Sequence, residues 1–166
     1  MKQHVVSALV ENRAGTLSRV SGLFSRRGFN IDSLTVGTTD DASISRMTIA
    51  VTGDDAVLEQ IIKQLSKLVD VIAVRELESE SCLRRELMLV KVGVDEKTRH
   101  AVIEVAGIFR SRVVDVSPAT ITIEATGDAK KLDGLLLLLR PYGVLELART
   151  GLVALERGSS ILSISN

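Results

Sequence analysis

The residues of this chain that could do chemistry gather in one short loop, residues 11–17. The loop contains Asn12, Ala14, Gly15, Thr16 and Leu17, and it lies between an apolar run and an amphipathic helical pattern. A strand that passes through a glycine-containing loop into a helix leaves several backbone N–H groups without acceptors. Such N–H donors at the positive end of a helix bind carboxylates. The loop therefore predicts a site for a small carboxylate, such as a free amino acid.

A free α-amino acid presents a carboxylate, an ammonium group and a side chain, and each needs its own partner. Gly15 lacks a Cβ atom, so a ligand carboxylate can approach the backbone closely. The side-chain carbonyls of Asn12 and Asn30 suit the ammonium group. Ile31 or Leu34 would supply an apolar wall. On spacing alone, Asn and Gly are also ordinary residues of a strand-to-helix turn, so a plain turn stays open as the alternative.

The composition argues against several other classes of function. The chain has 166 residues, is 45% apolar and carries a formal net charge of zero, so no strong field would attract nucleic acid or an anionic membrane. Cys82 is the only cysteine in the sequence, which rules out an intramolecular disulfide and makes a zinc cluster unfavourable. The N-terminus begins a strand-like run and no apolar run is long enough to span a bilayer, so a cytoplasmic location is expected.

The apolar periodicity of the first half predicts the order strand, helix, strand, strand, helix, strand. Gly28 is expected to end the first helix, and Asp54 is expected to cap the second. The expected elements, in chain order, are residues 5–10, 17–27, 31–36, 44–51, 57–68 and 69–75.

The second half repeats this order with a shorter hairpin near Pro118. At the loop that corresponds to residues 11–17, Lys97 and His100 stand where the first copy has Asn12 and Gly15. The fold therefore does not require Asn and Gly at this corner, and no effector is expected in the second copy. The matching segments are residues 20–27 with 105–112, 52–54 with 126–128 and 58–65 with 132–139.

Two copies of a βαββαβ unit predict an α+β fold made of two tandem ferredoxin-like domains. The expected boundaries are residues 1–77 for the first domain, 78–83 for a polar linker, 84–158 for the second domain and 159–166 for a tail. A unit of this size buries only a marginal core by itself and leaves sheet edges to be covered. Pairing of domains or of chains is therefore expected.

Longer segments resemble a known family. Residues 9–20 look like the opening of an ACT domain. Residues 22–36, 45–49 and 64–71 are similar to the regulatory small subunit of acetohydroxyacid synthase (acetolactate synthase), and residues 86–92 and 108–110 resemble its C-terminal half. The resemblance covers nearly the whole chain, so it favours an effector site over a plain turn at residues 11–17.

The resemblance implies a chain without catalytic activity that activates a separate large subunit, and that makes this subunit sensitive to feedback inhibition by valine in branched-chain amino-acid biosynthesis. Thiamine diphosphate, Mg²⁺ and FAD would belong to the large subunit, and this chain would hold no metal or cofactor. The family forms homodimers across the second strands of its ACT domains, with valine at the interface. The implied effector residues are Asn12, Ala14, Gly15, Thr16 and Leu17 of one chain with Asn30 and Ile31 of the other.

A catalytic role finds little support in the remaining residues. His4 and His100 are the only histidines in the sequence, and His4 is expected at the surface of its strand. Cys82 falls in the expected linker, with no neighbouring pattern that would activate a thiolate. The acidic pairs at residues 40–41 and 54–55 are typical of a turn and a helix cap rather than of metal ligands.

Two binding alternatives remain open at this point. RNA-recognition modules share the βαββαβ order, but they stack bases on aromatic side chains of two strands. The matching strands here carry Val5, Val6, Met47 and Ile49, with no aromatic residue. The chain could instead be an ACT-type sensor for a different biosynthetic enzyme, or could bind leucine or isoleucine. One methylene in a pocket changes affinity by only about 1–3 kcal/mol, so the loop alone does not rank branched aliphatic amino acids.

Overall fold

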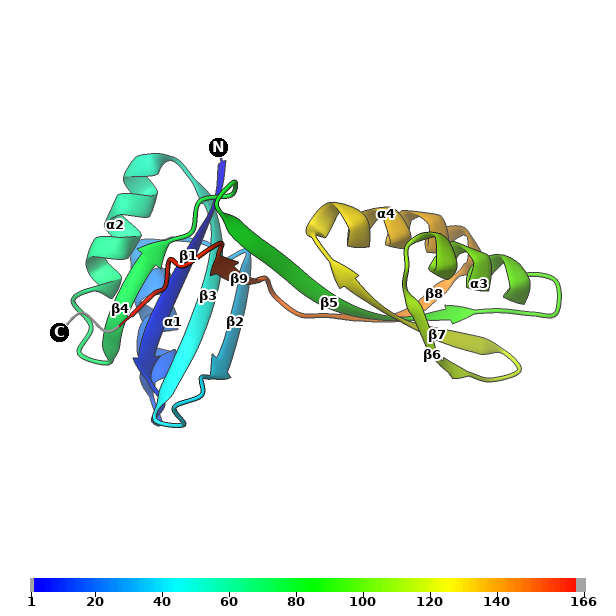
Figure 1. The fold of residues 1–166 in the computed structure, drawn as a ribbon, viewed down its shortest axis with the longest axis horizontal. Coiled ribbons are helices and arrows are strands. Elements are labelled where there is room, and N and C mark those ends of the chain that lie inside the picture. The colour runs from blue at the N-terminus through cyan, green and yellow to red at the C-terminus, as the bar shows by residue number, and fades with distance from the viewer. Residues whose placement is uncertain (1, 164–166) are drawn as a thin grey trace. The chain divides into compact units, whose positions relative to one another are not determined.

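A computed structural model describes residues 2–163 of the chain (Figure 1). The chain forms two compact units, one that combines Met1–Leu83 with Gly151–Asn166 and one made of Arg84–Thr150. Each unit has the predicted order of strands and helices, and the two sheets have the same strand order. The α+β class with two ferredoxin-like βαββαβ units is thereby confirmed.

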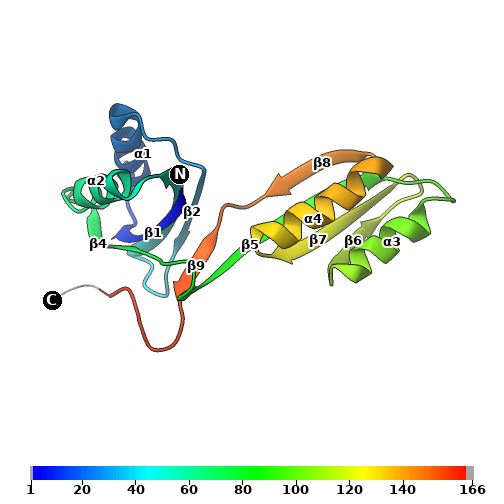
Figure 2. The ribbon, with the colours of Figure 1, turned by 90° about the horizontal axis from the view of Figure 1, so that it is seen from above.

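The first unit is a four-stranded antiparallel sheet with two helices on one face (Figure 2). Its strand order is β2-β3-β1-β4, so β2 lies at an edge. The predicted ends of α1 and α2 are confirmed, because Gly28 follows α1 and the Asp54 side chain accepts the Val57 N–H at 2.9 Å. The elements are β1 (Lys2–Glu11), α1 (Thr16–Arg27), β2 (Ser33–Thr38), β3 (Ile44–Gly53), α2 (Asp55–Leu65) and β4 (Val71–Glu76).

The two central strands of the first unit, β1 and β3, are largely buried on both faces. Val6, Ala8 and Val10 alternate along β1 and point toward the helices, where Phe24 of α1 packs against them. The residues between them are also buried, although they point to the opposite face. A nearly continuous apolar run is typical of a strand with both faces covered, and residues 5–10 follow this pattern with Ser7 as the one polar residue.

The second face is covered by the end of the chain, residues 151–163, which we call the C-terminal strap. Its strand β9 (Val153–Glu156) pairs with β5 (Cys82–Gly93). This covering differs from the predicted boundaries in two places. Residues 151–158 group with the first unit rather than the second, and residues 82–83 belong to a strand rather than to a linker. The strap completes a second small core formed by Val5, Leu77, Cys82, Leu152 and Ala154.

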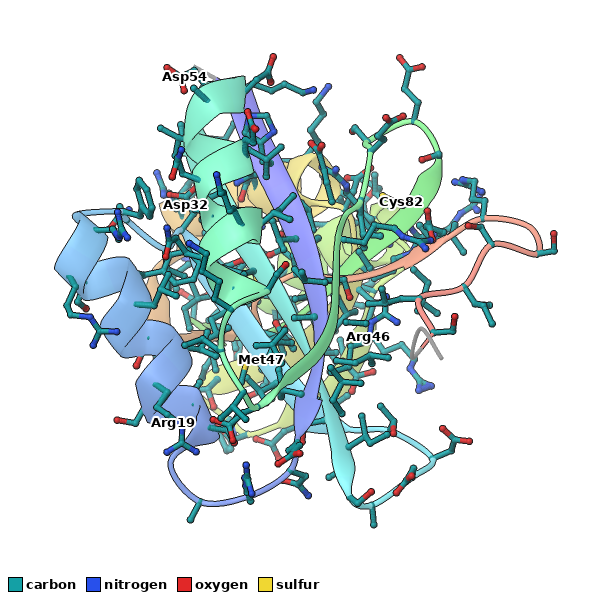
Figure 3. The ribbon with its side chains drawn as sticks, turned by 90° about the vertical axis from the view of Figure 1, so that its left-hand side faces the viewer. Arg19, Asp32, Arg46, Met47, Asp54 and Cys82 are labelled. Carbon is teal, nitrogen blue, oxygen red and sulfur yellow. The ribbon has the colours of Figure 1, made fainter. Side chains whose placement is uncertain are left out.

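Polar contacts fix the C-terminal strap to the sheet. The Arg46 guanidinium donates to the Ala154 carbonyl at 3.2 Å, and Arg75 pairs with Glu156 at 2.7 Å. Figure 3 shows Arg46 and Cys82 on the side of the sheet that faces the strap, and Met47 on the side of the helices. Gly151 runs so close to β2 that a Cβ atom there would lie 2.5 Å from Thr35 Oγ1. A side chain at this position would push the strap away from the sheet.

The second unit repeats the architecture around its own core, with strand order β6-β7-β5-β8. The Asp128 side chain accepts the Lys131 N–H at 2.8 Å, so the repeated Thr-Gly-Asp segment caps a helix in both units. Only three residues, 117–119, separate the strands of its first hairpin, as the repeat predicted near Pro118. The remaining elements are α3 (Arg99–Ile108), β6 (Arg112–Val116), β7 (Thr120–Gly127), α4 (Ala129–Leu139), a 3₁₀ turn (Arg140–Tyr142) and β8 (Val144–Arg149).

Candidate functional site

The corner between β1 and α1 exposes unused backbone donors. Gly15 precedes the first residue of α1 with a φ of 87°, in the left-handed region that glycine adopts without strain. No side chain caps the helix. Within the part of the chain that the structure describes, the N–H groups of Ala14, Gly15 and Leu17 have no hydrogen-bond acceptor. The corner therefore offers N–H donors at the positive end of a helix, which is an arrangement that binds anions.

Asn12 anchors the corner to the turn between β2 and β3. Its side-chain amide donates to the Ala42 carbonyl at 2.8 Å, and its backbone N–H donates to the Ser43 carbonyl at 2.7 Å. The side-chain oxygen of Asn12 remains as an acceptor. An open cavity of about 390 Å³ lies here and is lined by Glu11, Asn12, Arg13, Ser43, Ile44 and Ile72.

The buried carboxylate of Asp70, which the sequence pattern did not indicate, holds the corner between β1 and α1 in place. The side chain of Asp70 is only 1% exposed, and its Oδ1 accepts Nε and Nη2 of Arg13 at 3.0 and 2.8 Å. Its Oδ2 accepts Nε of Arg19, and its backbone carbonyl accepts the Glu11 N–H at 2.9 Å. These hydrogen bonds, first from Arg19 and then from Arg13, lower the pKa of Asp70. Hydrogen bonds with Asp70 and the charge of Glu11 raise the pKa of Arg13.

The only sequence signal for this cluster was charge placement. Arg13 and Arg19 lie six positions apart around the corner, and Asp70 interrupts the apolar pattern at the start of β4. Nothing in the periodicity joins these positions, because the pairing depends on the antiparallel contact between β1 and β4.

Asn30 and Ile31 lie at the other end of α1 in the same chain. A helix of 12 residues, the length of α1, is about 18 Å long. Figure 3 shows Arg19 near the lower end of α1 and Asp32 level with its upper end. Asn30 donates to Asp32 at 3.3 Å and lines a cavity of about 300 Å³ with Phe29 and Thr52. The structure thus brings residues 12–17 together, and it does not bring Asn30 and Ile31 of the same chain to them.

His4 and Cys82, which the sequence analysis considered for a catalytic role, are both buried in the fold. The expectation that His4 lies at the surface is wrong, because β1 is covered on both faces and the histidine is 2% exposed. Its Nδ1 lies 3.1 Å from Glu76 and its Nε2 lies 3.8 Å from Asp55. Cys82 is buried under the C-terminal strap.

Residues 2–163 contain no cluster of three or more side chains from His, Cys, Asp and Glu that could hold a metal ion. In the same range, no helix has the length and apolar character needed to cross a bilayer.

Two family profiles together cover most of the chain. The profile described as "AHAS small subunit-like ACT domain" matches residues 6–73. The profile described as "Small subunit of acetolactate synthase" matches residues 85–158. The two matches fall on the two βαββαβ repeats.

Similar proteins span nearly the same length. A "Probable acetolactate synthase small subunit" of Methanothermobacter thermautotrophicus is 55% identical over 157 residues, which are 94% of each chain. An "Acetolactate synthase small subunit" of Mycolicibacterium smegmatis is 53% identical over 93% of this chain and 91% of its own. The crystal structure of the small subunit of acetolactate synthase from Thermotoga maritima superposes with a TM-score of 0.90 at 41% identity, covering 96% of this chain and 100% of that one. This chain belongs to the family of acetolactate synthase small subunits, the non-catalytic regulatory partners of a catalytic large subunit.

Proposed function

We propose that this chain activates the catalytic large subunit of acetolactate synthase and makes it sensitive to inhibition by valine. The observation that carries the effector proposal is the corner at Gly15, where a helix begins on a left-handed glycine and neighbouring N–H groups have no acceptor among the described residues. Thiamine diphosphate, Mg²⁺ and FAD would be bound by the large subunit, and this chain would act by binding and by conformational change.

The proposed valine site lies between two copies of the chain. The valine carboxylate would accept the N–H groups around Ala14, Gly15, Thr16 and Leu17, and its ammonium group would donate to the Asn12 side chain. Asn30 and Ile31 of the second chain would complete the site. Two observations support this division. The two groups of residues lie at opposite ends of α1 in one chain, and β2 is an edge strand that can pair with a second copy.

Valine at such an interface would act by favouring one placement of the paired domains over another. A ligand shifts a conformational equilibrium only by its difference in affinity for the two states. A coupling of about 1–3 kcal/mol would correspond to an effect of roughly fivefold to 150-fold on affinity. The cooperation of two chains in one site gives valine direct contact with the element that moves.

Calorimetry with the purified chain tests the effector proposal. We expect valine to bind with a stoichiometry set by the homodimer, and serine, which lacks the branched aliphatic side chain, to bind at least tenfold more weakly. Leucine and isoleucine serve as the comparison that ranks the branched aliphatic effectors. A chain that binds none of these amino acids, and that activates the large subunit equally with and without valine, would contradict the proposal.

A further inference from the structure

We propose that Arg19 contacts the carboxylate of the effector, and that Asp70 is the positioning residue that holds the Arg19 guanidinium over Gly15. This inference rests on the proposed function, because it adds two residues to the same effector site. Neither residue is among the effector-binding residues that the loop pattern and the family resemblance imply. Those residues are Asn12, residues 14–17, Asn30 and Ile31.

The position of the Arg19 guanidinium carries the first step. A Cβ atom built on Gly15 would lie 2.9 Å from Arg19 Nη1 and 3.6 Å from Nη2, so the guanidinium covers the glycine. The N–H groups of Ala14, Gly15 and Leu17, which lack acceptors in the described chain, belong to the same corner. A carboxylate that reaches these N–H groups therefore comes within reach of a positive charge.

Arg19 has donors left for a ligand. Its Nε is used by Asp70, but within residues 2–163 neither Nη1 nor Nη2 has a hydrogen-bond partner. The side chain is 48% exposed, so a small molecule can reach it. Arg13 uses more of its donors, because it pairs with both Asp70 and Glu11, the latter at 2.7 Å. Within residues 2–163 Arg13 keeps only Nη1 without a partner, whereas Arg19 keeps both Nη1 and Nη2, so Arg19 has more free donors for a carboxylate.

Asp70 fixes this arrangement from the turn that precedes β4. Its carboxylate is buried, and both of its oxygens are occupied by the two arginines. Its backbone carbonyl holds the Glu11 N–H, so one residue ties together the end of β1 and the second turn of α1. A guanidinium held in this way has lost its rotational freedom before the ligand arrives, which lowers the entropic cost of binding.

Thr16 supports a polar ligand at the same corner. The residue is only 3% exposed, and its hydroxyl has no hydrogen-bond partner among the described residues. Buried hydroxyls in folded proteins nearly always have a partner, because leaving one unsatisfied costs free energy. The start of α1 thus holds an unpaired polar group, which an effector carboxylate would reach only if this corner opens.

The alternative is that Arg19 only balances the charge of Asp70. A comparison of valine with valinamide separates the two roles, because valinamide keeps the ammonium group and side chain but carries a neutral amide in place of the carboxylate. The titrations are run near pH 6.5, where α-amino groups with a pKa of about 7.7–8.0 remain charged. The measured quantity is the ratio of the two affinities in the full-length homodimer.

The variant Arg19→Gln is compared with Arg26→Gln. Arg26 is a matched control, because it lies on the same helix and its Nη1 covers Gly22 at 3.3 Å from the ideal Cβ position, just as Arg19 covers Gly15. We expect Arg19→Gln to weaken valine binding by about tenfold to a hundredfold, the range for hydrogen bonds to charged groups, with little effect on valinamide. Arg26→Gln should leave both affinities unchanged.

Asp70→Asn tests the positioning role. We expect it to reduce the ratio of valine to valinamide affinity in the same direction as Arg19→Gln, and we expect Arg19→Gln to change the ratio little further in the Asp70→Asn background. A merely structural role of Asp70 would instead weaken both ligands by the same factor. If Arg19→Gln does not fold, Arg19→Lys keeps the charge but removes the planar fork, and the ratio should then fall by a smaller factor.

Each negative result of these titrations would overturn a different part of the proposal. Equal weakening of valine and valinamide in the Arg19 variants would overturn the role of Arg19 while leaving the proposed function in place. Equal weakening of the two ligands in Asp70→Asn would overturn the positioning role. A parent protein that binds no branched-chain amino acid would overturn the proposed function itself.

Discussion

Gly15 combines two properties that other residues do not offer together at this corner. It adopts a positive φ without strain, and it leaves open the space where the Arg19 guanidinium meets the free N–H groups. Asn12, by contrast, contributes through its side chain, which anchors the corner to the next turn and leaves its oxygen as an acceptor. The proposed site thus depends both on the absence of a side chain at Gly15 and on the side-chain oxygen of Asn12.

Gly15→Asp should abolish inhibition by valine while the large subunit is still activated. The new carboxylate would occupy the place of the ligand carboxylate and would pair with Arg19, whose flexible side chain can move to admit it. Asp tolerates the left-handed region better than most residues, so the fold should survive. Activity of the reconstituted enzyme with and without valine is the measurement. Gly107→Asp, in an open position on α3, is the control and should stay sensitive. Unchanged inhibition of the Gly15 variant would refute the site.

The Asp70 cluster makes stability depend on pH in a specific direction. The pKa of Asp70 is lowered in the folded state from its ordinary value of 3.8, so its charged form stabilises the fold above that value. This contribution is lost as the pH falls through the lowered pKa. Urea unfolding of the parent and Asp70→Asn should therefore differ by a constant amount above about pH 5, and by less as the pH falls toward 3. A difference that is the same at pH 3 and pH 7 would contradict the assignment.

At the scale of elements, the sequence predicted those features that depend on residues close together in the chain. The helix ends at Gly28 and the caps at Asp54 and Asp128 depend on neighbours within a few positions, and all three are observed. The C-terminal strap was missed because β9 has only four residues and its partner face belongs to the other end of the chain. A signal was available in residues 5–10, where apolar residues occupy positions on both faces of the strand and only Ser7 is polar.

The residues of the candidate site also differ in whether the sequence could predict them. Asn12 and the following residues could be predicted because they form one continuous loop with its own turn chemistry. The Asp70 cluster could not, because three charged residues meet only when β4 pairs with β1. Asn30 was assigned from its side-chain chemistry and from family resemblance, and its place beside Asn12 could not be predicted because α1 separates the two in the same chain.

The two equivalent caps allow a test of the repeat. Asp54→Ala and Asp128→Ala should each lower the free energy of unfolding by about 1 kcal/mol, because each removes the acceptor of one N–H group in the first turn of its helix. Asp55→Ala serves as the control, since that exposed side chain accepts no hydrogen bond at the cap. Urea unfolding followed by circular dichroism is the measurement. If only one of the two substitutions lowers the free energy of unfolding, the helix of the other unit does not depend on its cap for stability.

At the scale of the whole molecule, the second unit is an insertion within the first. The chain leaves the first unit after Leu83 and returns at Gly151, where the strap closes the sheet. The first unit therefore contains both chain segments that its two cores require. The internal repeat predicted two domains in tandem, and the contacts between residues 2–83 and the strap add this nesting.

Replacing residues 84–150 with a short Gly/Ser linker should leave the first unit folded. The shortened chain keeps the strap, and with it the cover over Val5 and Leu77. A fragment that ends at residue 83 should expose that face, bind a hydrophobic dye and aggregate, because uncovered apolar surface of a sheet associates readily. Thermal melting and light scattering of the two fragments are the measurements. Equal behaviour would show that the strap adds nothing to the stability of the sheet.

The position of the strap also sets an order of events during synthesis. A ribosome adds about 5–20 residues per second, so the strap emerges several seconds after β1–β4 are complete. Throughout that interval the sheet that would bind the effector has one finished face and one bare face. Binding proteins of the cell would meet the nascent chain in this half-covered form, and residues 151–163, translated after the second unit, close a domain whose sheet was made before that unit.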